Sequence, residues 1–410
     1  MGGTVNVMSV RLSNGLRCVA RRVGGATECC GITFNSGSRD EIVECDHGLA
    51  HFVEHTIFKG TSRRSGSYVL NRMEAVGGDL NAFTTKEETT VYSLMPSGNF
   101  RRAMRLIGEL VSDSAFPEKG LQLERDVVCD EIDSYLDSPA EAAYDLFDEM
   151  IFAGNPLAHN ILGRKETVMD LTGERCRRYL RERFTADNGV FFYLGPADCE
   201  TVLREAERSF ASLPLLAIEA PRTLPLVSSP EVMVQDNGSH QCHTVMGTAV
   251  GGLHAADRHV TALAVNILGG PGMNAWLNLA LRERNGLVYT VEASTALYSD
   301  CGLMTIYFGC DHSDLEKCRR LVRRTLERFA DRPLTERQLS AYKRQYLGQL
   351  TLGHDNKEQL ALSSARAILH GLNVPDLAET SERIRSVSAG QLHDAAIRLA
   401  DAPLRALTLS

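Results

Sequence analysis

The first half of the chain alternates between two periods of apolar and polar residues, and the shorter period predicts strands. Residues 7–35 alternate around a Ser-Asn-Gly turn at 13–15, which predicts a hairpin followed by a further strand. Residues 80–85 and 89–95 are rich in β-branched and aromatic side chains and predict two more strands. The apolar run at 190–195 predicts a buried strand that closes this half.

Helical spacing covers much of the sequence between these strands. It predicts one helix through residues 47–60, a second from Ser67 to Val76 and a third from Phe100 to Phe116. Residues 117–150 predict one or two long helices with a break near Ser138-Pro139, because proline cannot continue a helix.

The second half repeats this pattern after a stretch rich in proline. Four prolines fall between residues 214 and 230, which predicts a linker. Residues 231–247 then alternate around an Asp-Asn-Gly turn, which predicts a second hairpin like the first. The elements predicted after it are helices at 257–268 and 274–284, a strand pair up to about residue 308, and a basic amphipathic helix at 315–329.

The weak repeat predicts two homologous domains, 1–213 and 231–410, joined by the linker 214–230. The length of 410 residues supports this division, because a chain of that size is too long for one apolar core.

Composition narrows the class of protein. The chain is 43% apolar and 23% charged, as expected of a soluble globular protein. Its apolar runs are far shorter than the roughly 18 residues that cross a bilayer, and its first residues lack a secretory signal, so no membrane association is expected. Eleven cysteines without paired spacing predict reduced thiols in a cytoplasmic protein. The net charge of −8 argues against nucleic acid as a partner.

The helix predicted at 47–60 carries the candidate chemistry. At 100° per residue, His51 and His55 lie about 40° apart on it and Glu54 about 60° to the other side of His51. Two imidazoles one turn apart can hold a zinc ion, which lowers the pKa of a water molecule to about 7, and Glu54 is placed to take the proton. Apolar neighbours such as Phe52 predict a buried helix rather than a solvated one in which the pattern arises by chance. The chemistry that this spacing favours is hydrolysis of a peptide bond.

A zinc site with two imidazoles needs a third protein ligand from another part of the chain. Glu124 and Glu131 are seven residues apart on the helix predicted after Pro117, so they share one face within about 20°. We predict Glu131 as the ligand and Glu124 as an outer carboxylate that orients the ligands. Periodicity alone also allows a solvated acidic face.

Two other motifs are weaker. His240, Cys242 and His243 are of types that ligate metals, but the alternation around them is more typical of a strand. The glycine-rich run at 268–274 lacks the Gly-Lys-Ser/Thr of a phosphate-binding loop, so we reject nucleotide binding there.

The segment from His47 to Thr61, together with Gly77-Gly-Asp-Leu-Asn-Ala-Phe-Thr84, resembles the pitrilysin-type (inverzincin) zinc metallopeptidases. The resemblance covers essentially the whole chain. It implies one zinc ion per chain, held by His51, His55 and Glu131, with Glu54 as the general base. The second acidic residue of the family, seven positions before the last ligand, corresponds to Glu124.

The resemblance also implies how a peptide is bound. Asn81, Ala82 and Phe83 match the edge strand to which the substrate backbone is added. Arg282 and Tyr289 match a pair in the family that holds the substrate and stabilises the oxyanion. Without the resemblance, a surface arginine and a packed tyrosine would be the simpler interpretation.

The fold implied by the resemblance is α+β, with two homologous domains, each a mainly antiparallel sheet covered on one face by helices. Two such pairs close like a clamshell around a chamber, and this chain provides half of it. Because the chain carries both the zinc motif and the Arg/Tyr pair, we predict a homodimer in which Arg282 and Tyr289 of one chain complete the zinc site of the other. The alternatives are a non-catalytic scaffold subunit and a zinc-bearing subunit that needs a different homologous partner.

Overall fold

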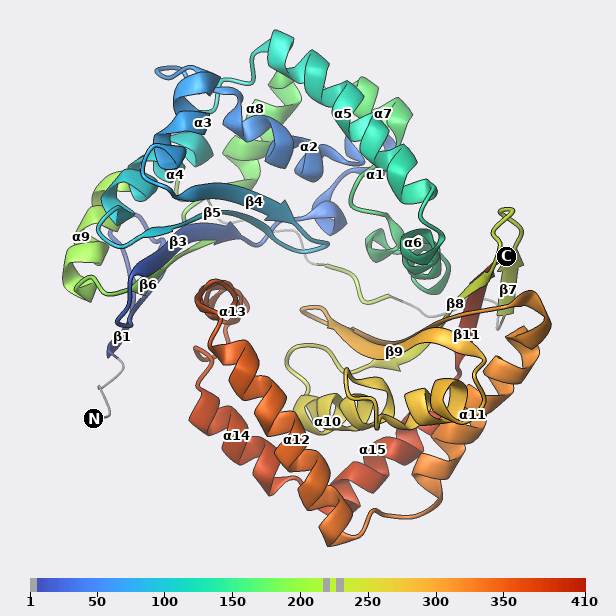
Figure 1. The fold of residues 1–410 in the computed structure, drawn as a ribbon. Helices are drawn as coiled ribbons and strands as arrows, with labels where there is room; N and C mark the ends of the chain where they lie inside the picture. The colour runs from blue at the N-terminus through green and yellow to red at the C-terminus, as the bar shows by residue number, and fades with distance from the viewer. Residues whose placement is uncertain (1–5, 217–221, 226–231) are drawn as a thin grey trace. The chain divides into compact units, whose positions relative to one another are not determined.

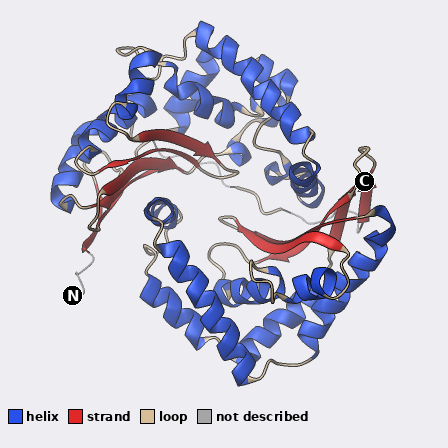
Figure 2. Ribbon diagram, viewed as in Figure 1, coloured by secondary structure: helices blue, strands red, loops and turns tan. Residues whose placement is uncertain are grey.

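The structure, a computed structural model, describes residues 6–216, 222–225 and 232–410. Its strands gather into two sheets, and helices pack on both (Figure 2). The chain divides into two compact units with one sheet each, which confirms the predicted α+β class. The first unit comprises Met1–Asp133, His159–Pro221 and Gly353–Pro375, and the second comprises Ser134–Ala158, Arg222–Leu352 and Asp376–Ser410.

The sheet of the first unit has six described strands. They are β1 (Asn6–Arg11), β2 (Arg17–Arg22), β3 (Thr27–Phe34), β4 (Asp79–Thr84), β5 (Thr89–Pro96) and β6 (Gly189–Gly195). Their order is β1-β2-β6-β3-β5-β4, and of these pairs only β2 with β6 is parallel (Figure 1). β1 and β2 form the predicted hairpin, and β4 lies at an edge of the sheet.

Helices cover both faces of this sheet. The helices of the first unit are α1 (Val43–Asp46), α2 (Leu49–Thr56), α3 (Gly66–Glu74), α4 (Phe100–Asp113), most of α5 (Glu118–Leu136), α7 (Lys165–Met169), α8 (Gly173–Arg183), α9 (Cys199–Ser209) and α13 (Lys357–Leu369). α2, α4 and α9 bury one face of the sheet in a large apolar core that contains Ile32 and Phe52. α13 covers the opposite face through contacts of Ala361 and Ala365 with residues such as Phe192 (Figure 1).

The second unit has a sheet of five described strands. They are β7 (Val232–Gln235), β8 (Cys242–Val250), β9 (Val288–Leu297), β10 (Gly302–Cys310) and β11 (Arg405–Leu409). Their order is β7-β11-β8-β10-β9, and the pair β7 with β11 is parallel. β9 is therefore an edge strand, as β4 is in the first unit.

The helices of the second unit also lie on both faces of its sheet. They are α6 (Pro139–Ile151), α10 (Arg258–Gly269), a widened π-helical turn (Asn278–Glu283), α11 (Leu315–Asp331), most of α12 (Glu336–His354), α14 (Leu377–Ser386) and α15 (Ala389–Asp401). α10, α11 and α15 enclose a core that contains Phe308 and Val322. α6 packs on the other face, where Phe147 meets Val245 and Leu407. We predicted helices on only one face of each sheet. In the structure, the other face of each sheet also carries a helix, α13 in the first unit and α6 in the second.

The two units repeat one topology. The strand order β2-β6-β3-β5-β4 in the first has the same directions as β7-β11-β8-β10-β9 in the second. α5 and α12 are both 19 residues long, and the helices that follow them, α6 and α13, are both 13 residues long. In each half of the chain, the shorter helix packs on the sheet of the other half.

The predicted hairpin at 231–247 is wrong. β7 and β8 lie in one sheet, but β11 separates them, and Leu407 of β11 pairs with Met233 on one side and Val245 on the other. Alternation in the sequence reports that one face of each strand is buried, and it does not identify the neighbouring strand. The missing neighbour comes from the C-terminal end of the chain.

The compact units differ from the predicted ranges 1–213 and 231–410 because α6 and α13 are exchanged between them. Parts of the predicted linker, residues 217–221 and 226–230, lie outside the described residues, and its described parts contain no helix or strand.

All eleven cysteines are free thiols, and eight of them are buried. Among the described helices, none combines the length and the apolar character needed to cross a bilayer.

Candidate metal centre

The local sequence fixes the start of α2, the helix that carries the two histidines. Gly48 precedes the helix with φ of +90°, and a Cβ atom there would lie 2.7 Å from the carbonyl oxygen of Leu162, so glycine is required. The carboxylate of Glu41 accepts hydrogen bonds from the backbone amides of Gly48 and Ala50, at 2.9 and 2.7 Å. These two bonds satisfy amides that a helix leaves unpaired at its N-terminus.

Packing holds α2 against the sheet. Leu49, Phe52 and Val53 are fully or almost fully buried in the core of the first unit. His51 is only 6% exposed, while Glu54 and His55 are partly exposed on the adjoining face. The predicted buried helix with a polar face is therefore present.

The structure brings Glu131 of α5 to the two histidines. Its Oε2 atom lies 3.4 Å from Nε2 of His55 and 3.7 Å from Nε2 of His51. The three ligand atoms all lie within 4.8 Å of one another, and no other group of three ligands among the described residues meets this limit.

These distances fit a tetrahedral zinc ion. Ligand atoms about 2.1 Å from such an ion are about 3.4 Å apart, close to the two distances given by Glu131. The donor set of two imidazoles and one carboxylate is a usual one for zinc that retains an open position for water or substrate.

Electrostatics favour the protonation states that metal binding requires. Burial, and secondarily repulsion from His55, lowers the pKa of His51 to about 3, so its imidazole is neutral and its lone pair available at neutral pH. Burial raises the pKa of Glu54, against the opposing effects of Thr84 and His55. A carboxylate of raised pKa takes a proton more readily than one in water, as a general base must.

Glu124 lies beside His55, one of the predicted ligands. Its Oε2 atom is 3.2 Å from Nδ1 of His55, and its other oxygen forms an ion pair with Lys59. A carboxylate at Nδ1 holds the proton on that nitrogen and leaves Nε2 free to bind a metal. Lys59 follows His55 by four residues, so helical spacing could have identified it in advance.

The edge strand β4 ends next to the candidate base. Thr84, its last residue, lies near enough to the Glu54 carboxylate to oppose the rise in its pKa that burial causes. Asn81 is exposed and its neighbours Ala82 and Phe83 are half-buried, so the predicted binding strand lies beside α2 with one edge open. Nothing in the sequence marked Thr84 as a contact of Glu54, because a long connection separates them.

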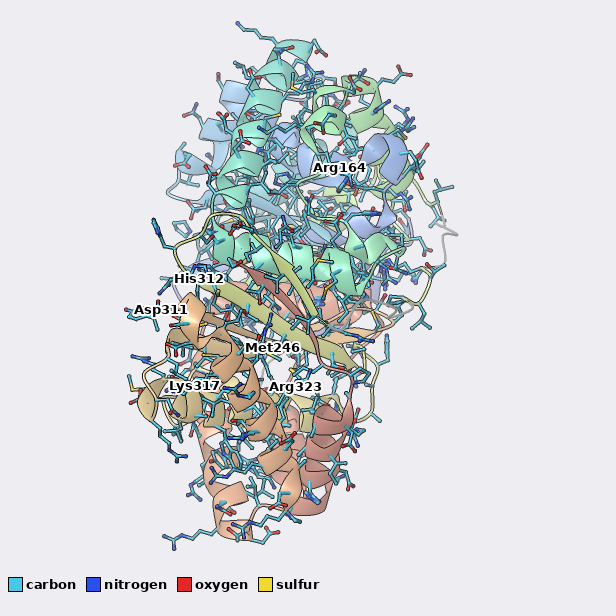
Figure 3. The ribbon with its side chains drawn as sticks, turned by 90° about the vertical axis from the view of Figure 1, so that its right-hand side faces the viewer. Arg164, Met246, Asp311, His312, Lys317 and Arg323 are labelled. Carbon is cyan, nitrogen blue, oxygen red and sulfur yellow. The ribbon has the colours of Figure 1, made fainter. Side chains whose placement is uncertain are left out.

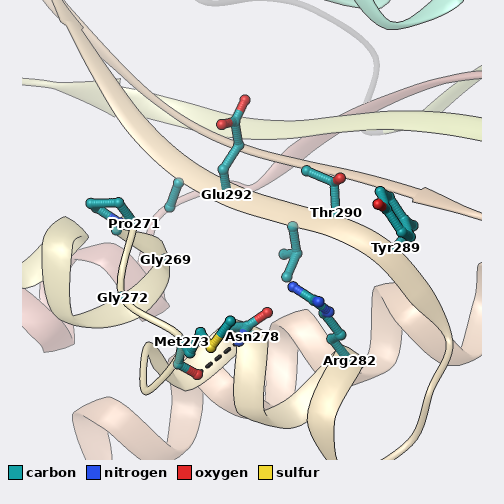
Figure 4. A pocket seen from close by; sticks show the side chains of 12 residues that line it. Gly269, Pro271, Gly272, Met273, Asn278, Arg282, Tyr289, Thr290 and Glu292 are labelled. Atoms are coloured by element: carbon teal, nitrogen blue, oxygen red, sulfur yellow. Dashed lines mark hydrogen bonds between the residues drawn. The ribbon is translucent and has the colours of Figure 1, made fainter.

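In the second unit, Arg282 and Tyr289 line one cavity of about 290 Å³ (Figure 4). Arg282 comes from the π-helical turn, and Tyr289, at the start of β9, is 85% exposed. Residues 269–273 of the glycine-rich run also line this cavity. The two predicted residues thus share one site, and Tyr289 is not the packed tyrosine of the simpler interpretation.

Among its described residues, the second unit has no such ligands at the equivalent place. Gln349 stands 13 residues after the start of α12, as Glu131 does in α5. Its side chain accepts a hydrogen bond of 2.8 Å from Asn266 on α10, the helix that corresponds to α2. Two neutral amides that satisfy each other take the place of the histidines and the carboxylate.

Comparisons with known proteins also distinguish the two halves of the chain. Residues 21–165 match the family described as insulinase (peptidase family M16), and residues 170–346 match the peptidase M16 inactive domain. The chain is 30% identical to an uncharacterized zinc protease of Streptomyces coelicolor, over 86% of this chain and 78% of that protein. It is also 30% identical to an uncharacterized zinc protease of Bacillus subtilis, over 78% of each.

Two solved structures share the fold. A protease from Helicobacter pylori matches with a TM-score of 0.90 and 19% identity, over 99% of this chain and 100% of that one. A peptidase M16 inactive domain from Pseudomonas fluorescens matches with a TM-score of 0.90 and 17% identity, over 99% and 98% of the two chains.

Proposed function

Because the chain belongs to the insulinase family of peptidases, family M16, we propose that it is a zinc-dependent endopeptidase that hydrolyses small or unfolded peptides in an enclosed chamber. The observation that carries the proposal is the convergence of His51, His55 and Glu131 on one point beside Glu54. Its relatives are named zinc proteases, and these names support both zinc as the metal and peptide hydrolysis as the reaction.

In the proposed mechanism, His51, His55 and Glu131 would hold the ion. When bound, zinc supplies Lewis acidity that lowers the pKa of water and polarises the scissile carbonyl. Glu54 takes a proton from the attacking water and then gives it to the leaving amine. Its raised pKa suits both steps, because the group must gain the proton and then lose it within one turnover. Glu124 keeps His55 oriented through Nδ1.

The substrate is proposed to bind as an added strand along β4. An edge strand offers unpaired backbone groups that an extended peptide can satisfy irrespective of its sequence. Asn81, Ala82 and Phe83 would provide these bonds. An unfolded peptide meets the requirement, whereas a folded protein has its backbone groups already paired.

We expect hydrolysis to require the metal ion but no second, different protein subunit. Purified protein should cleave an unstructured peptide, lose that activity in a chelator and regain it on addition of zinc. The measurement is the release of fluorescence from a quenched peptide at each stage. A chain that binds zinc but cleaves only after a homologous subunit is added would support the heteromeric alternative, and one that never cleaves would support the scaffold.

We further propose a homodimer in which Arg282 and Tyr289 complete the zinc site of the partner chain. The exposure of both residues on one cavity supports a role in binding. A heterodimer of Glu54→Gln with Arg282→Ala should then regain about half of the wild-type activity, because one of its two sites contains both intact residues. Differently tagged chains, co-expressed and purified in sequence, allow the measurement.

The matched control is a heterodimer of the wild-type chain with the double variant Glu54→Gln/Arg282→Ala. It should be inactive if the residues act between chains and half-active if they act within one chain. The opposite pair of results, or a fully active monomer in sedimentation, would contradict the proposal.

A further inference from the structure

Three consecutive charged residues are buried in the turn between β4 and β5. Lys86, Glu87 and Glu88 are 6%, 2% and 4% exposed. Charged side chains are almost never buried to this extent unless they are paired. The turn directly follows Thr84, the last residue of the strand that is proposed to bind the peptide. The partners of these side chains therefore determine how the end of that strand is held.

Glu87 is paired with Arg39, which lies in the segment before α1. Its Oε1 atom is 2.6 Å from Nη1 of Arg39, and the two side chains are 3% and 1% exposed. A carboxylate and a guanidinium that are removed from water attract each other enough to offset their burial only while their geometry is maintained. Because apolar contacts have no preferred direction, this ion pair resists relative movement of the two segments more than apolar side chains would.

Backbone contacts run beside this ion pair. The amide of Ser38 donates a hydrogen bond to the carbonyl oxygen of Thr85 at 3.2 Å, and the amide of Arg39 donates one at 2.8 Å to the next carbonyl, that of Lys86. A Cβ atom at Gly37 would lie 2.2 Å from the oxygen of Thr85, so only glycine allows the segment and the turn to come this close.

The same segment reaches the start of α2. Glu41, two residues after Arg39, accepts the hydrogen bonds from the amides of Gly48 and Ala50. α2 in turn carries Glu54 and packs against β4. The residues from Arg39 to Glu41 therefore connect the end of the proposed peptide-binding strand with the helix that carries the candidate base.

A second loop also connects the turn with α2. The ammonium group of Lys86 donates a hydrogen bond to the carbonyl oxygen of His159, at the start of this loop. The carbonyl oxygen of the next residue, Asn160, accepts a hydrogen bond of 3.1 Å from Nε2 of His47, two residues before α2. Figure 3 shows Arg164, at which the loop ends and α7 begins. Two separate segments thus hold the turn in place relative to α2.

From these contacts we propose that Arg39 and Glu87 are positioning residues for peptide hydrolysis, an inference that rests on the proposed function. The reaction requires a water molecule beside Glu54 on α2 to meet a carbonyl group of a peptide that is held by a different element, β4. A misplacement of about 1 Å between reacting groups can cost about 100-fold in rate. The buried ion pair fixes the turn that joins the two elements, and so fixes where the peptide carbonyl lies relative to Glu54.

Glu87→Gln tests this role, because it keeps the shape of the side chain and removes the charge. The value of kcat on a quenched peptide should fall about 10- to 100-fold. KM should change little, since the backbone groups of β4 remain available to the peptide, and the zinc content should not change.

The matched control is Glu205→Gln in the first unit. Glu205 lies on α9, is 3% exposed and is also paired at 2.6 Å with an arginine, Arg105, but it does not connect β4 with α2. This variant should keep the wild-type kcat. An equal loss of kcat in the two variants would overturn the proposal.

The double variant Arg39→Met/Glu87→Met separates positioning from stability. Apolar side chains of similar volume in place of a buried ion pair often leave stability unchanged or raise it. The double variant should therefore unfold at or above the wild-type midpoint and keep its zinc, yet show the reduced kcat of Glu87→Gln. Wild-type kcat in this folded variant would show that the pair only stabilises the fold, and would overturn the proposal. A wild-type chain that never cleaves would instead contradict the proposed function, and this inference with it.

Discussion

Replacement of Glu54 by glutamine is expected to reduce peptide hydrolysis by about 10³-fold or more while leaving the zinc content unchanged. Glutamine has nearly the same shape, so His51 and His55 keep their positions on α2, but its amide cannot take a proton from water. The measurement is kcat on a quenched peptide, together with zinc per chain by mass spectrometry.

The control for this variant is Glu74→Gln, which makes the same chemical change at an exposed position on α3. It should retain wild-type kcat and zinc content. Normal turnover by the Glu54 variant would refute the assignment of the base. Loss of zinc from it would show instead that the carboxylate contributes to metal binding.

The second large effect concerns the ligands themselves. His55→Ala should weaken zinc binding by more than the roughly 10- to 100-fold that is typical for loss of an outer partner, because one of only three protein donors is removed. Hydrolysis should be lost with the metal. Zinc should raise the unfolding midpoint of the wild-type chain, since it binds the folded state, and should not raise that of the variant.

Glu124→Gln provides the graded comparison, because it keeps all three donors and alters only the contact at Nδ1 of His55. Its zinc affinity should fall within the 10- to 100-fold range. Competition with a chelator of known affinity measures both variants. Equal affinities for the wild type and His55→Ala would exclude His55 as a ligand.

Helix α2, which carries the candidate site, could be predicted from sequence because its information is local. The spacing of His51, Glu54 and His55 determines which face they share once the helix forms, and the apolar residues between them determine which face is buried. The place of Glu131 needed more than spacing. A seven-residue interval on α5 is equally compatible with a solvated face, and the resemblance to a known family supplied the partner.

Features that depend on distant segments could not be predicted in this way. The neighbour of β7 is β11, which lies some 170 residues further along the chain, and alternation at 231–247 contains no trace of it. Glu41 caps α2 from a preceding loop, and Thr84 reaches Glu54 from the end of another element. Such contacts follow from tertiary packing, for which a single sequence has no periodic signal.

Because α6 and α13 are exchanged between the two halves of the chain, the first half cannot finish folding while it is being synthesised. Until α13 emerges, the face of the first sheet formed by residues such as Val190 and Phe192 has no cover, although every strand of that sheet is already synthesised. A nascent or proteolysed product that stops near residue 213 would therefore display an apolar surface and tend to aggregate. Splitting the protein into two separately expressed halves would leave each half lacking the helix that the other encodes.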